Sequence, residues 1–413
     1  MKPTTLFTFI ADMIEPVRLV LRITRFVGEP IFWLFGFRHR NRSIPILLAR
    51  RVLVTRLDEI GNVILITPFL RELRKNMPRV WITLIVKPEI YNLVEMCPYV
   101  DEILTFEPKA TGCHKTLTHY FQIVTFAARH LWAKKFDVAV LPVWHLDKGY
   151  YGSLLTYVSG AARRVAYSER VHVDKQKGNK GCDRLFTDVI LDTTLRHEVE
   201  RNLEVVKFLG GSVTDDALEV WIDERDIHFA EETLTRHGVK PHDLLVCFCM
   251  GASVPRRRWP PERFRQLGMW LHKNYNVRIL LLGNSLEKDM GEELSRDLGE
   301  SVVNIIGMTT LRQATALLKS CVLSIGSDSG LKHIATALRI PVVEISPFGN
   351  TSFPMSLNTP QAFKPWKVPH IQLGPKKPDD VCKYGCVSLT PHCILQVTVE
   401  EVQAAAQKLL SLS

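Results

Sequence analysis

From Arg51 onward, short apolar runs alternate with longer amphipathic stretches, and this alternation constrains the fold more than any other feature of the sequence. In the first half, the apolar runs predict strands at Val52–Leu57, Trp81–Val86, Val138–Pro142 and Arg164–Tyr167. The stretches between them predict helices at Val63–Asn76, Leu117–Lys135 and Gly149–Ser159. Strands that alternate with helices form a parallel sheet with helices on both faces, so this half predicts a doubly wound α/β domain.

The same alternation returns after a predicted connector at Val220–Asp226. It predicts strands at Leu244–Cys249, Val277–Leu282, Val302–Ile306, Val322–Gly326 and Val342–Ser346. It predicts helices at Pro261–Tyr275, Leu286–Leu298, Leu311–Lys319, Leu331–Leu338 and Val399–Leu410. The polar segments His172–Arg184 and Thr351–Asp380 are expected to be loops. Two doubly wound halves predict a cleft between them, and ligands of such sheets bind beyond the carboxyl ends of the strands.

Length, net charge and cysteine content limit the classes of function that this chain can have. A chain of 413 residues has room for two or three domains. Its net charge of +10 favours anionic partners such as phospholipid heads, nucleic acid or a phosphorylated substrate. Nine cysteines are too few for a disulfide framework, so a reducing compartment is expected.

The amino-terminal segment, residues 1–45, is basic and amphipathic. Arginines interrupt its apolar runs Leu6–Ile10, Val17–Ile23 and Ile31–Phe37. No run reaches the length of a membrane-spanning helix, and a signal peptide would have one clean apolar core followed by a cleavage site. The pattern favours contact with a membrane surface, with a helix packed on the first domain or an irregular tail as the alternatives.

The loop from Arg56 to Asn62 follows the first strand, where ligands of doubly wound sheets tend to lie. Gly61 permits a tight turn and close backbone approach. Asp58 and Glu59 are candidates for proton abstraction from a substrate. Helix capping is the alternative role for these polar residues.

Two further strand-to-helix loops point to an anionic ligand. Gly251–Pro260 contains Ser253 and three arginines, whose guanidinium groups match phosphate oxygens, although a solvated basic turn is the alternative. Gly326–His333 contains small residues that leave backbone N–H groups available to a diphosphate, and Asp328 is a candidate helix cap. A complete G-x-G-x-x-G and a P-loop motif are both missing, which counts against a dinucleotide redox enzyme and a P-loop NTPase.

The order and spacing of longer motifs resemble glycosyltransferase family 9, the lipopolysaccharide heptosyltransferase family. The resemblance extends from about Arg51 to Ala406 and is carried by RVLVTRLDEIGNVILITPFLRELR, RRRWPPERF, LLGNSLEKD, GSDSGLKHIATALRIPVV and a cysteine-bearing tail ending in VTVEEV. It implies a GT-B fold of two Rossmann-like domains, an acceptor domain at 46–222 and a donor domain at 223–398. A carboxyl-terminal helix, 399–413, would pack back toward the first domain.

The resemblance also implies a reaction. It is an inverting, metal-independent transfer of a sugar without a cofactor, with ADP-heptose as the most expected nucleotide sugar. The acceptor would be a lipid-linked saccharide such as the lipopolysaccharide core, which places the protein in the cytoplasm, peripheral on the inner membrane. A nucleic-acid partner is not expected, because the sequence contains no recognisable nucleic-acid-reading module.

The resemblance assigns donor contacts residue by residue. Arg257 corresponds to the basic residue that contacts donor phosphate, where Lys is common, and Ser253 to a hydroxyl of the same loop. Glu287 corresponds to the acidic residue that holds the ribose, and Met308 lies where the family packs the nucleobase. The diphosphate loop corresponds to Asp328, Ser329, Gly330 and His333.

One position departs from the family. The proposed catalytic base of the family is an Asp directly after the glycine of the first motif, and this chain has Asn62 there. An amide does not accept a proton as a carboxylate does. Three interpretations stay open: Asp58 or Glu59 acts as the base, catalysis proceeds by positioning and leaving-group stabilisation, or the chain is a catalytically silent relative that binds a nucleotide sugar.

Other polar residues have less specific interpretations. Cys382, Cys386 and Cys393, with His392, are open to zinc binding, a disulfide or plain packing, and their spacing is not a usual zinc pattern. His197 and Asn202 resemble a family pattern near the acceptor, with a surface helix as the alternative. The Lys175–Lys180 stretch is expected to be a solvated loop, with a phosphate clamp as the alternative.

Overall fold

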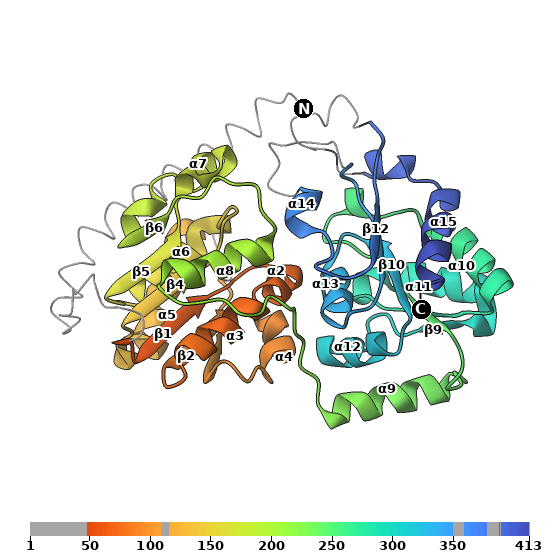
Figure 1. The fold of residues 1–413 in the computed structure, drawn as a ribbon, viewed down its shortest axis with the longest axis horizontal. Helices are drawn as coiled ribbons and strands as arrows, with labels where there is room; N and C mark the ends of the chain where they lie inside the picture. Colours follow the sequence, from red (N-terminus) through yellow and green to blue (C-terminus); the bar gives the residue numbers. More distant parts are fainter. Residues whose placement is uncertain (1–47, 109–114, 350–358, 378–387, 389, 413) are drawn as a thin grey trace. The chain divides into compact units, whose positions relative to one another are not determined.

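The computed structural model describes residues 48–108, 115–349, 359–377, 388 and 390–412. The amino-terminal segment 1–45 and the cysteines Cys382 and Cys386 lie outside these residues. The described chain forms two compact units, drawn in Figure 1. The first contains residues up to 58, 68–91 and 98–216, and the second contains 59–67, 92–97 and residues from 217 onward.

The first unit is built on a six-stranded parallel sheet in the order β3-β2-β1-β4-β5-β6. Its strands are β1 (Arg51–Thr55), β2 (Trp81–Val86), β3 (Glu102–Thr105), β4 (Val138–Leu141), β5 (Arg163–Tyr167) and β6 (Asp188–Ile190). Val54 of β1 pairs with Leu84 of β2 on one side and Val140 of β4 on the other. This strand order changes direction at β1, so the carboxyl ends of β1 and β4 form the switch point where ligands bind such sheets.

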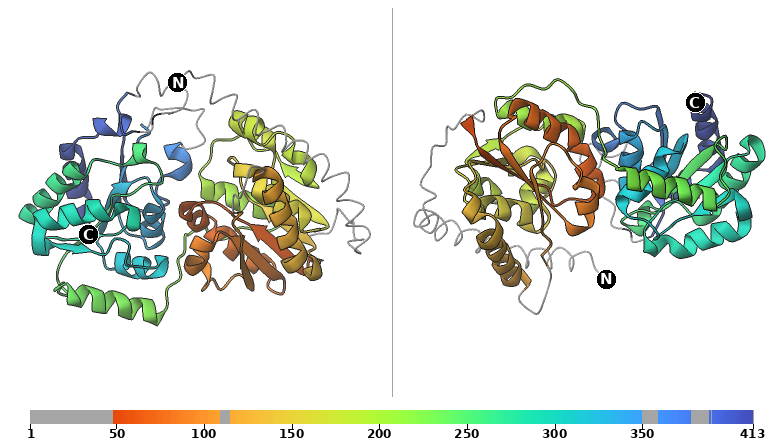
Figure 2. Two further views of the ribbon diagram at one scale, coloured as in Figure 1. Left: turned by 180° about the vertical axis from the view of Figure 1, so that it is seen from behind. Right: turned by 90° about the horizontal axis from the view of Figure 1, so that it is seen from below.

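The helices between these strands are α2 (Ile60–Leu65), α3 (Thr67–Asn76), α4 (Tyr91–Val94), α5 (Lys115–His130), α6 (Tyr151–Val158), α7 (Val173–Gly178) and α8 (Glu198–Phe208). Figures 1 and 2 show α5 and α6 on one face of the first sheet and α8 on the other, whereas α2 and most of α4 belong to the second unit. The single helix predicted at Val63–Asn76 is two helices. Pro68 explains the break, because it has no N–H to donate to the Ile64 carbonyl, and the Thr67 hydroxyl donates to that oxygen at 2.8 Å instead.

The prediction of a flexible loop at His172–Arg184 is wrong. Residues Val173–Gly178 form α7, and a 3-10 turn follows at Cys182–Leu185. Lys175, expected to be solvated, is buried, and its Nζ donates to the carbonyls of Val143 at 2.6 Å and Tyr167 at 3.1 Å. These hydrogen bonds tie a polar segment to the ends of β4 and β5, which its local sequence does not indicate.

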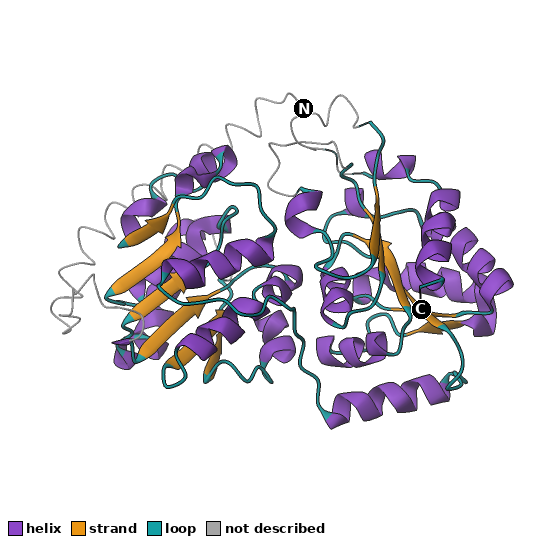
Figure 3. Cartoon of the chain, viewed as in Figure 1, coloured by secondary structure: helices purple, strands orange, loops and turns teal. Residues whose placement is uncertain are grey.

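The second unit repeats the topology of the first with the order β12-β11-β10-β7-β8-β9. Its strands are β7 (Leu245–Cys249), β8 (Arg278–Leu281), β9 (Val302–Asn304), β10 (Leu323–Ser327), β11 (Val342–Ile345) and β12 (His370–Leu373). Its longer helices are α9 (Glu224–Arg236), α10 (Pro261–Tyr275), α11 (Lys288–Leu298), α12 (Leu311–Lys319), α13 (Gly330–Ala337) and α15 (Val399–Leu410), with a short α14 (Pro360–Phe363). Figure 3 shows helices on both sides of each sheet.

Two predictions for this half need correction. The connector ends at Asp223, which caps the unpredicted helix α9 by accepting a hydrogen bond from the Asp226 N–H at 3.0 Å. The segment expected to be irregular contains α14 and the edge strand β12. Helix α15 packs in the core of the second unit, with Val402 and Trp259 in one buried cluster.

Candidate functional site

In the first unit, a buried arginine contacts two carboxylates and a backbone carbonyl near the carboxyl ends of β1 and β4. Arg56 follows β1 and is fully buried. Its Nε lies 2.8 Å from Asp58 Oδ2, and its Nη2 lies 2.9 Å from Glu198 Oε1. Its Nη1 donates to the Pro142 carbonyl, directly after β4. One guanidinium therefore fixes the orientation of Asp58 at the switch point of the sheet.

An unpredicted imidazole lies beside Asp58. His145 comes from the loop after β4, and its Nε2 is 3.7 Å from Asp58 Oδ2. The His145 Nδ1 is 3.2 Å from the Leu146 carbonyl, so this nitrogen donates when it carries the hydrogen. The sequence contained one signal for this residue: strand β4 ends just before it, and neighbouring parallel strands bring their carboxyl ends to one edge.

Glu59 and Asn62 occupy the start of α2. Glu59 is exposed and is the N-cap residue of α2, without a side-chain cap hydrogen bond. Asn62 lies within the helix, and its backbone N–H donates to the Glu59 carbonyl at 3.0 Å. The capping alternative therefore does not account for the carboxylate of Glu59.

Helix α8 also faces this network. His197 caps the helix by accepting from the Val199 N–H at 3.2 Å, and Asn202 Oδ1 lies 3.3 Å from Arg56 Nη1. Arg201 stacks over Trp144, with its Cζ 3.5 Å from the ring centroid. These side chains are buried, so the surface-helix alternative for this segment is wrong.

In the second unit, Asp328 follows β10 and pairs with two cations. Its Oδ1 lies 2.6 Å from Lys332 Nζ, and its Oδ2 lies 3.3 Å from Arg257 Nη1. Burial alone would raise the pKa of Asp328, but the charges of Lys332 and Arg257 outweigh burial and lower this pKa to about 2. Arg257 and Asp328, two of the predicted donor residues, are thus brought together.

Lys332 was not predicted as a site residue. Its Nζ also lies 3.0 Å from Glu344 Oε1 on β11. Burial would lower the pKa of Lys332, but the neighbouring carboxylates Asp328 and Glu344 raise it. Burial raises the pKa of Glu344 to about 7, and the charge of Lys332 offsets this effect only in part. A lysine four residues after Asp328, on the apolar face of a short helix, was the available sequence signal.

The remaining loop residues begin α13. Ser329 is its N-cap residue without a side-chain cap hydrogen bond, so the candidate capping role of Asp328 is wrong. Ser329 Oγ is buried and has no hydrogen-bond partner among the described residues. Gly330 is the first helical residue, and His333 is buried one turn later. Unpaired N–H groups at a helix start attract an anion, and the unpaired hydroxyl adds a donor.

Of the three neighbouring arginines, Arg257 is the one that pairs with Asp328 of this loop in the described residues. Arg258 donates twice to the Ala252 carbonyl, at 3.1 Å each, and Arg256 lies 3.4 Å from the Ser388 carbonyl. Arg257 Nε is buried without a hydrogen-bond partner in the described part of the chain. Ser253 is exposed in the same loop. The solvated-turn alternative fits Ser253 but not Arg257.

The two residues assigned to the nucleoside differ in environment. Glu287 is buried, and its Oε2 accepts from the Asn284 N–H at 2.8 Å in a capping box. Met308 is 70% exposed, and such an apolar side chain is available for contact with a ligand. The structural role of Glu287 is clear, and its contact with a ribose stays a prediction.

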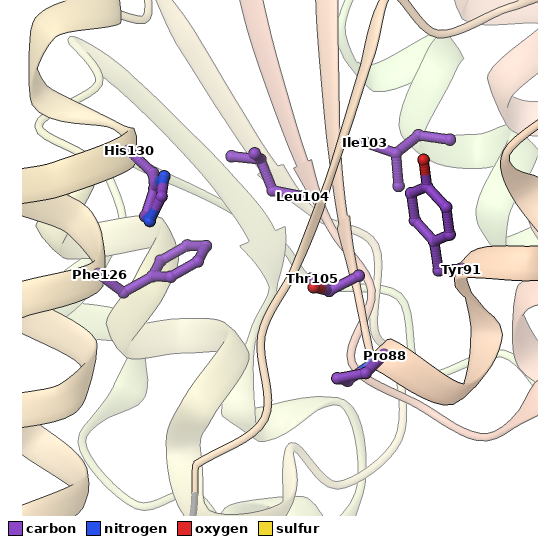
Figure 4. A pocket seen from close by; sticks show the side chains of 7 residues that line it. All are labelled: Pro88, Tyr91, Ile103, Leu104, Thr105, Phe126 and His130. Atoms are coloured by element: carbon purple, nitrogen blue, oxygen red, sulfur yellow. The ribbon is translucent and has the colours of Figure 1, made fainter.

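A separate hollow of about 530 Å³ lies at the edge strand β3 of the first unit. Figure 4 shows Phe126 and His130 of α5 on one side and Tyr91 on the other, with Thr105 between them. Its lining mixes apolar rings with polar groups, and the hollow is open to solvent. None of these residues was predicted as a site residue.

The described residues contain neither a metal-binding cluster nor a bilayer-spanning helix. In this part of the chain, no group of three or more His, Cys, Asp or Glu side chains is arranged to hold a metal ion. Cys393 is a buried free thiol, which agrees with the packing alternative for this one cysteine. Within the same residues, no helix combines the length and apolar character needed to cross a bilayer.

The sequence is similar to known proteins of one family. The model of the family described as glycosyltransferase family 9 (heptosyltransferase) matches residues 150–383, more than half of the sequence. The lipooligosaccharide heptosyltransferase 2 of Haemophilus influenzae is 35% identical over 114 residues, 26% of this chain and 32% of the relative. The chain thus aligns with about a third of that protein. The lipopolysaccharide heptosyltransferase 3 of Escherichia coli is 23% identical over 361 residues, 85% of this chain and 95% of the relative.

Among solved structures, the glycosyl transferase family 9 protein from Veillonella parvula superposes with a TM-score of 0.72 at 25% identity. The match covers 88% of this chain and 98% of that one. The predicted α/β fold of GT-B type, with two doubly wound units, is therefore confirmed. The matched family range contains the loops of Arg257, Glu287 and Asp328, whereas the loop of Asp58 precedes it.

Proposed function

Because the chain belongs to glycosyltransferase family 9, the heptosyltransferase family, we propose that it transfers a sugar, heptose in the first instance, from a nucleoside diphosphate donor. The acceptor is a saccharide of the lipopolysaccharide-core type. The observation that carries the proposal is the loop before α13, where Arg257 meets Asp328 beside the unpaired hydroxyl of Ser329. Relatives that bear the names of lipooligosaccharide and lipopolysaccharide heptosyltransferases support the sugar and the acceptor class.

The donor diphosphate would bind at the start of α13. The first N–H groups of this helix, the Arg257 guanidinium and the Ser329 hydroxyl are hydrogen-bond donors for phosphate oxygens. As the bond between the anomeric carbon and the diphosphate breaks, negative charge grows on the leaving group. The same donors stabilise this charge, so leaving-group stabilisation is their part in catalysis. ADP is the nucleotide that the family resemblance favours.

The acceptor hydroxyl would attack the anomeric carbon from the face opposite the diphosphate and lose its proton to a carboxylate. Asp58 is the first candidate, because Arg56 Nε holds its orientation at 2.8 Å. Glu59 is the second candidate, because it is exposed next to Asp58. Inversion of the anomeric centre follows from this single displacement.

The alternative function is a silent relative that binds a nucleotide sugar without turnover. The amide of Asn62, where the family has a carboxylate, favours it. Asn62→Asp separates the two proposals. A gain of activity from none supports the silent relative, whereas an active wild-type protein excludes it.

The proposed place of action is the cytoplasmic face of the inner membrane. An acceptor anchored in lipid requires an enzyme at that surface, and the net charge of +10 suits an anionic surface. Residues 1–45 are the proposed contact, and they lie outside the described residues.

The first test is a thermal-shift series with ADP, UDP and GDP and their sugar derivatives, without added metal. A ligand that binds only the folded state raises the unfolding midpoint as its concentration increases. We expect a selective rise with ADP and with ADP-sugars. A chain that responds to none of these nucleotides contradicts the proposed donor site.

A further inference from the structure

Lys332 uses all of its hydrogen-bonding capacity inside the protein. Its Nζ lies 2.6 Å from Asp328 Oδ1, 3.0 Å from Glu344 Oε1 and 2.9 Å from the carbonyl of Phe363. An ammonium group has three N–H donors, and these three oxygens occupy them. The side chain is 3% exposed. Lys332 therefore has no donor left for a ligand, and its effect on a ligand must pass through Asp328.

Arg257 differs from Lys332 in this respect. It contacts one oxygen of Asp328 through Nη1 at 3.3 Å, a longer distance than that of Lys332 to the other oxygen. Its Nε is buried without a hydrogen-bond partner in the described chain. A diphosphate at the start of α13 would thus compete with Asp328 for Arg257.

The competition has an electrostatic consequence. If Arg257 were the sole partner of Asp328, its transfer to a phosphate would leave a largely buried carboxylate unpaired beside the diphosphate. Breaking a buried ion pair in this way is strongly unfavourable. Lys332 avoids this free-energy cost, because it stays paired with the second carboxylate oxygen of Asp328 whether or not Arg257 has moved.

We propose that Lys332 is a positioning residue of the donor site, which keeps Asp328 paired while Arg257 exchanges this carboxylate for a donor phosphate. Glu344 carries the charge opposite to that of Lys332. Its protonation state sets the net charge of the cluster that it forms with Lys332, Asp328 and Arg257. The inference rests on the proposed function and deepens it, because it assigns roles in donor binding to two residues that do not touch the donor.

The role of Glu344 makes donor binding sensitive to pH. With Glu344 ionised, Arg257 and Lys332 balance two carboxylates; with Glu344 protonated, one positive charge remains. Burial raises the pKa of Glu344 to about 7, so the change falls near neutral pH. We expect donor affinity to fall as the pH rises through this value. Asp328, Lys332 and Arg257 face Glu344, and His333 acts on Asp328.

Glu344→Gln tests the charge. The measurement is the dissociation constant of an ADP-sugar by titration calorimetry between about pH 6 and about pH 8.5. An ADP-sugar has no terminal phosphate, whose second proton would otherwise titrate near pH 6. We expect the variant to bind about fivefold more tightly than wild type at the highest pH and to lose most of the pH dependence. His333 is retained, so its own titration does not account for this difference.

Lys332→Met combined with Glu344→Gln tests the positioning role. The double variant removes the lysine together with its buried counter-charge and keeps the pair of Arg257 and Asp328. We expect its donor affinity to be about tenfold weaker than that of Glu344→Gln, and its unfolding midpoint without ligand to be lower, because the Phe363 carbonyl loses its buried donor. The matched control is Lys207→Met with Glu204→Gln, a pair at 3.5 Å on α8 whose lysine is exposed and whose glutamate is half-buried, and neither quantity should change in it.

Each possible result of these measurements supports or contradicts the proposed roles of Lys332 and Glu344. Equal donor affinity of Glu344→Gln and the double variant would show that Lys332 is only structural. If Glu344→Gln kept the pH dependence of wild-type donor binding, the proposed role of Glu344 would be wrong. This comparison of wild type with Glu344→Gln tests the inference by itself if the double variant does not fold. A wild-type protein that binds no nucleoside diphosphate sugar overturns the proposed function and this inference together, whereas binding without any pH response overturns the inference alone.

Discussion

At the scale of single residues, the candidate site is organised by ion pairs that local sequence does not reveal. Arg56 and Lys332 are both buried, and each binds two carboxylates. The sequence motifs indicated Asp58 and Asp328 as candidates, but not the cations that fix them. Ion pairs between segments far apart in the chain form only when the strands bring them to one edge of a sheet.

Removal of the cation from the first network should lower stability. Arg56→Met removes the cation at 2.9 Å from Glu198, which is fully buried and keeps only the more distant Arg201 at 3.6 Å. Loss of one member of a buried pair costs about 3–5 kcal/mol in the free energy of unfolding. Urea denaturation measures this change. The double variant Arg56→Met with Glu198→Gln should recover part of the loss, and no recovery would show that the guanidinium contributes through packing alone.

The choice of catalytic base makes a second prediction at this scale. Asp58→Asn removes the carboxylate charge but keeps a side chain of nearly the same shape beside Arg56. We expect kcat to fall by about 10²–10⁴-fold, because a positioned base contributes about that factor, while the thermal shift caused by ADP stays unchanged.

Glu59→Gln is the matched comparison on the adjacent residue, and Asp58 as the base predicts a much smaller change in kcat for this variant. The opposite ranking of the two variants would assign the base to Glu59. Full activity of both variants would favour catalysis by positioning and leaving-group stabilisation alone.

At the scale of elements, helices with strong local signals were predicted to the residue. Helices α10, α12 and α15 have the bounds that the sequence indicated, and capping boxes at Thr310 and Thr398 begin two of them. The edge strands β3, β6 and β12 were missed, because they are short and only partly buried. Helix α7 was missed for a different reason, since its anchor is the tertiary contact of Lys175.

Helix α7 should depend on that anchor. Lys175→Met removes the donor to the carbonyls of Val143 and Tyr167, and each buried acceptor left unpaired costs about 1–3 kcal/mol. We expect faster amide hydrogen exchange in residues 173–178 and a lower unfolding midpoint. Lys177→Met, an exposed position on the same helix, should leave both unchanged. Equal exchange rates in the two variants would show that α7 is held by other contacts.

At the scale of the whole molecule, the chain builds the same strand order twice. Each sheet begins its topology with a central strand, β1 or β7, whose neighbours on the two sides are the second and fourth strands of that unit. Such strands are buried on both faces, which explains their continuous apolar sequence. The basic charge is a property of this scale as well, because an anionic surface acts on the sum of many exposed side chains.

The proposed membrane contact is testable with the full chain and vesicles. We expect binding to vesicles that contain anionic lipid and release by salt, because screening shortens the range of the attraction. Charge removal by Arg18→Gln, Arg22→Gln and Arg25→Gln should weaken binding by at least about tenfold, since each basic residue near such a surface contributes about 1 kcal/mol. Sedimentation with the vesicles measures the bound fraction.

The matched control for this experiment removes the same charge from exposed lysines of the second unit. It consists of Lys273→Gln, Lys319→Gln and Lys408→Gln. An equal loss of binding in the two triple variants would assign the effect to net charge and contradict a role for the amino-terminal segment.

The sequence by itself determined the fold class and the position of the donor loops. Apolar periodicity is local, and a strand-to-helix turn such as Gly326–His333 is recognised from adjacent residues. The tertiary structure alone decided which charges meet: Asp58 with Arg56 and His145 in one unit, and Asp328 with Arg257 in the other. The physical reason is that ion pairing and burial depend on distances between segments remote in sequence, which exist only after the sheets have formed.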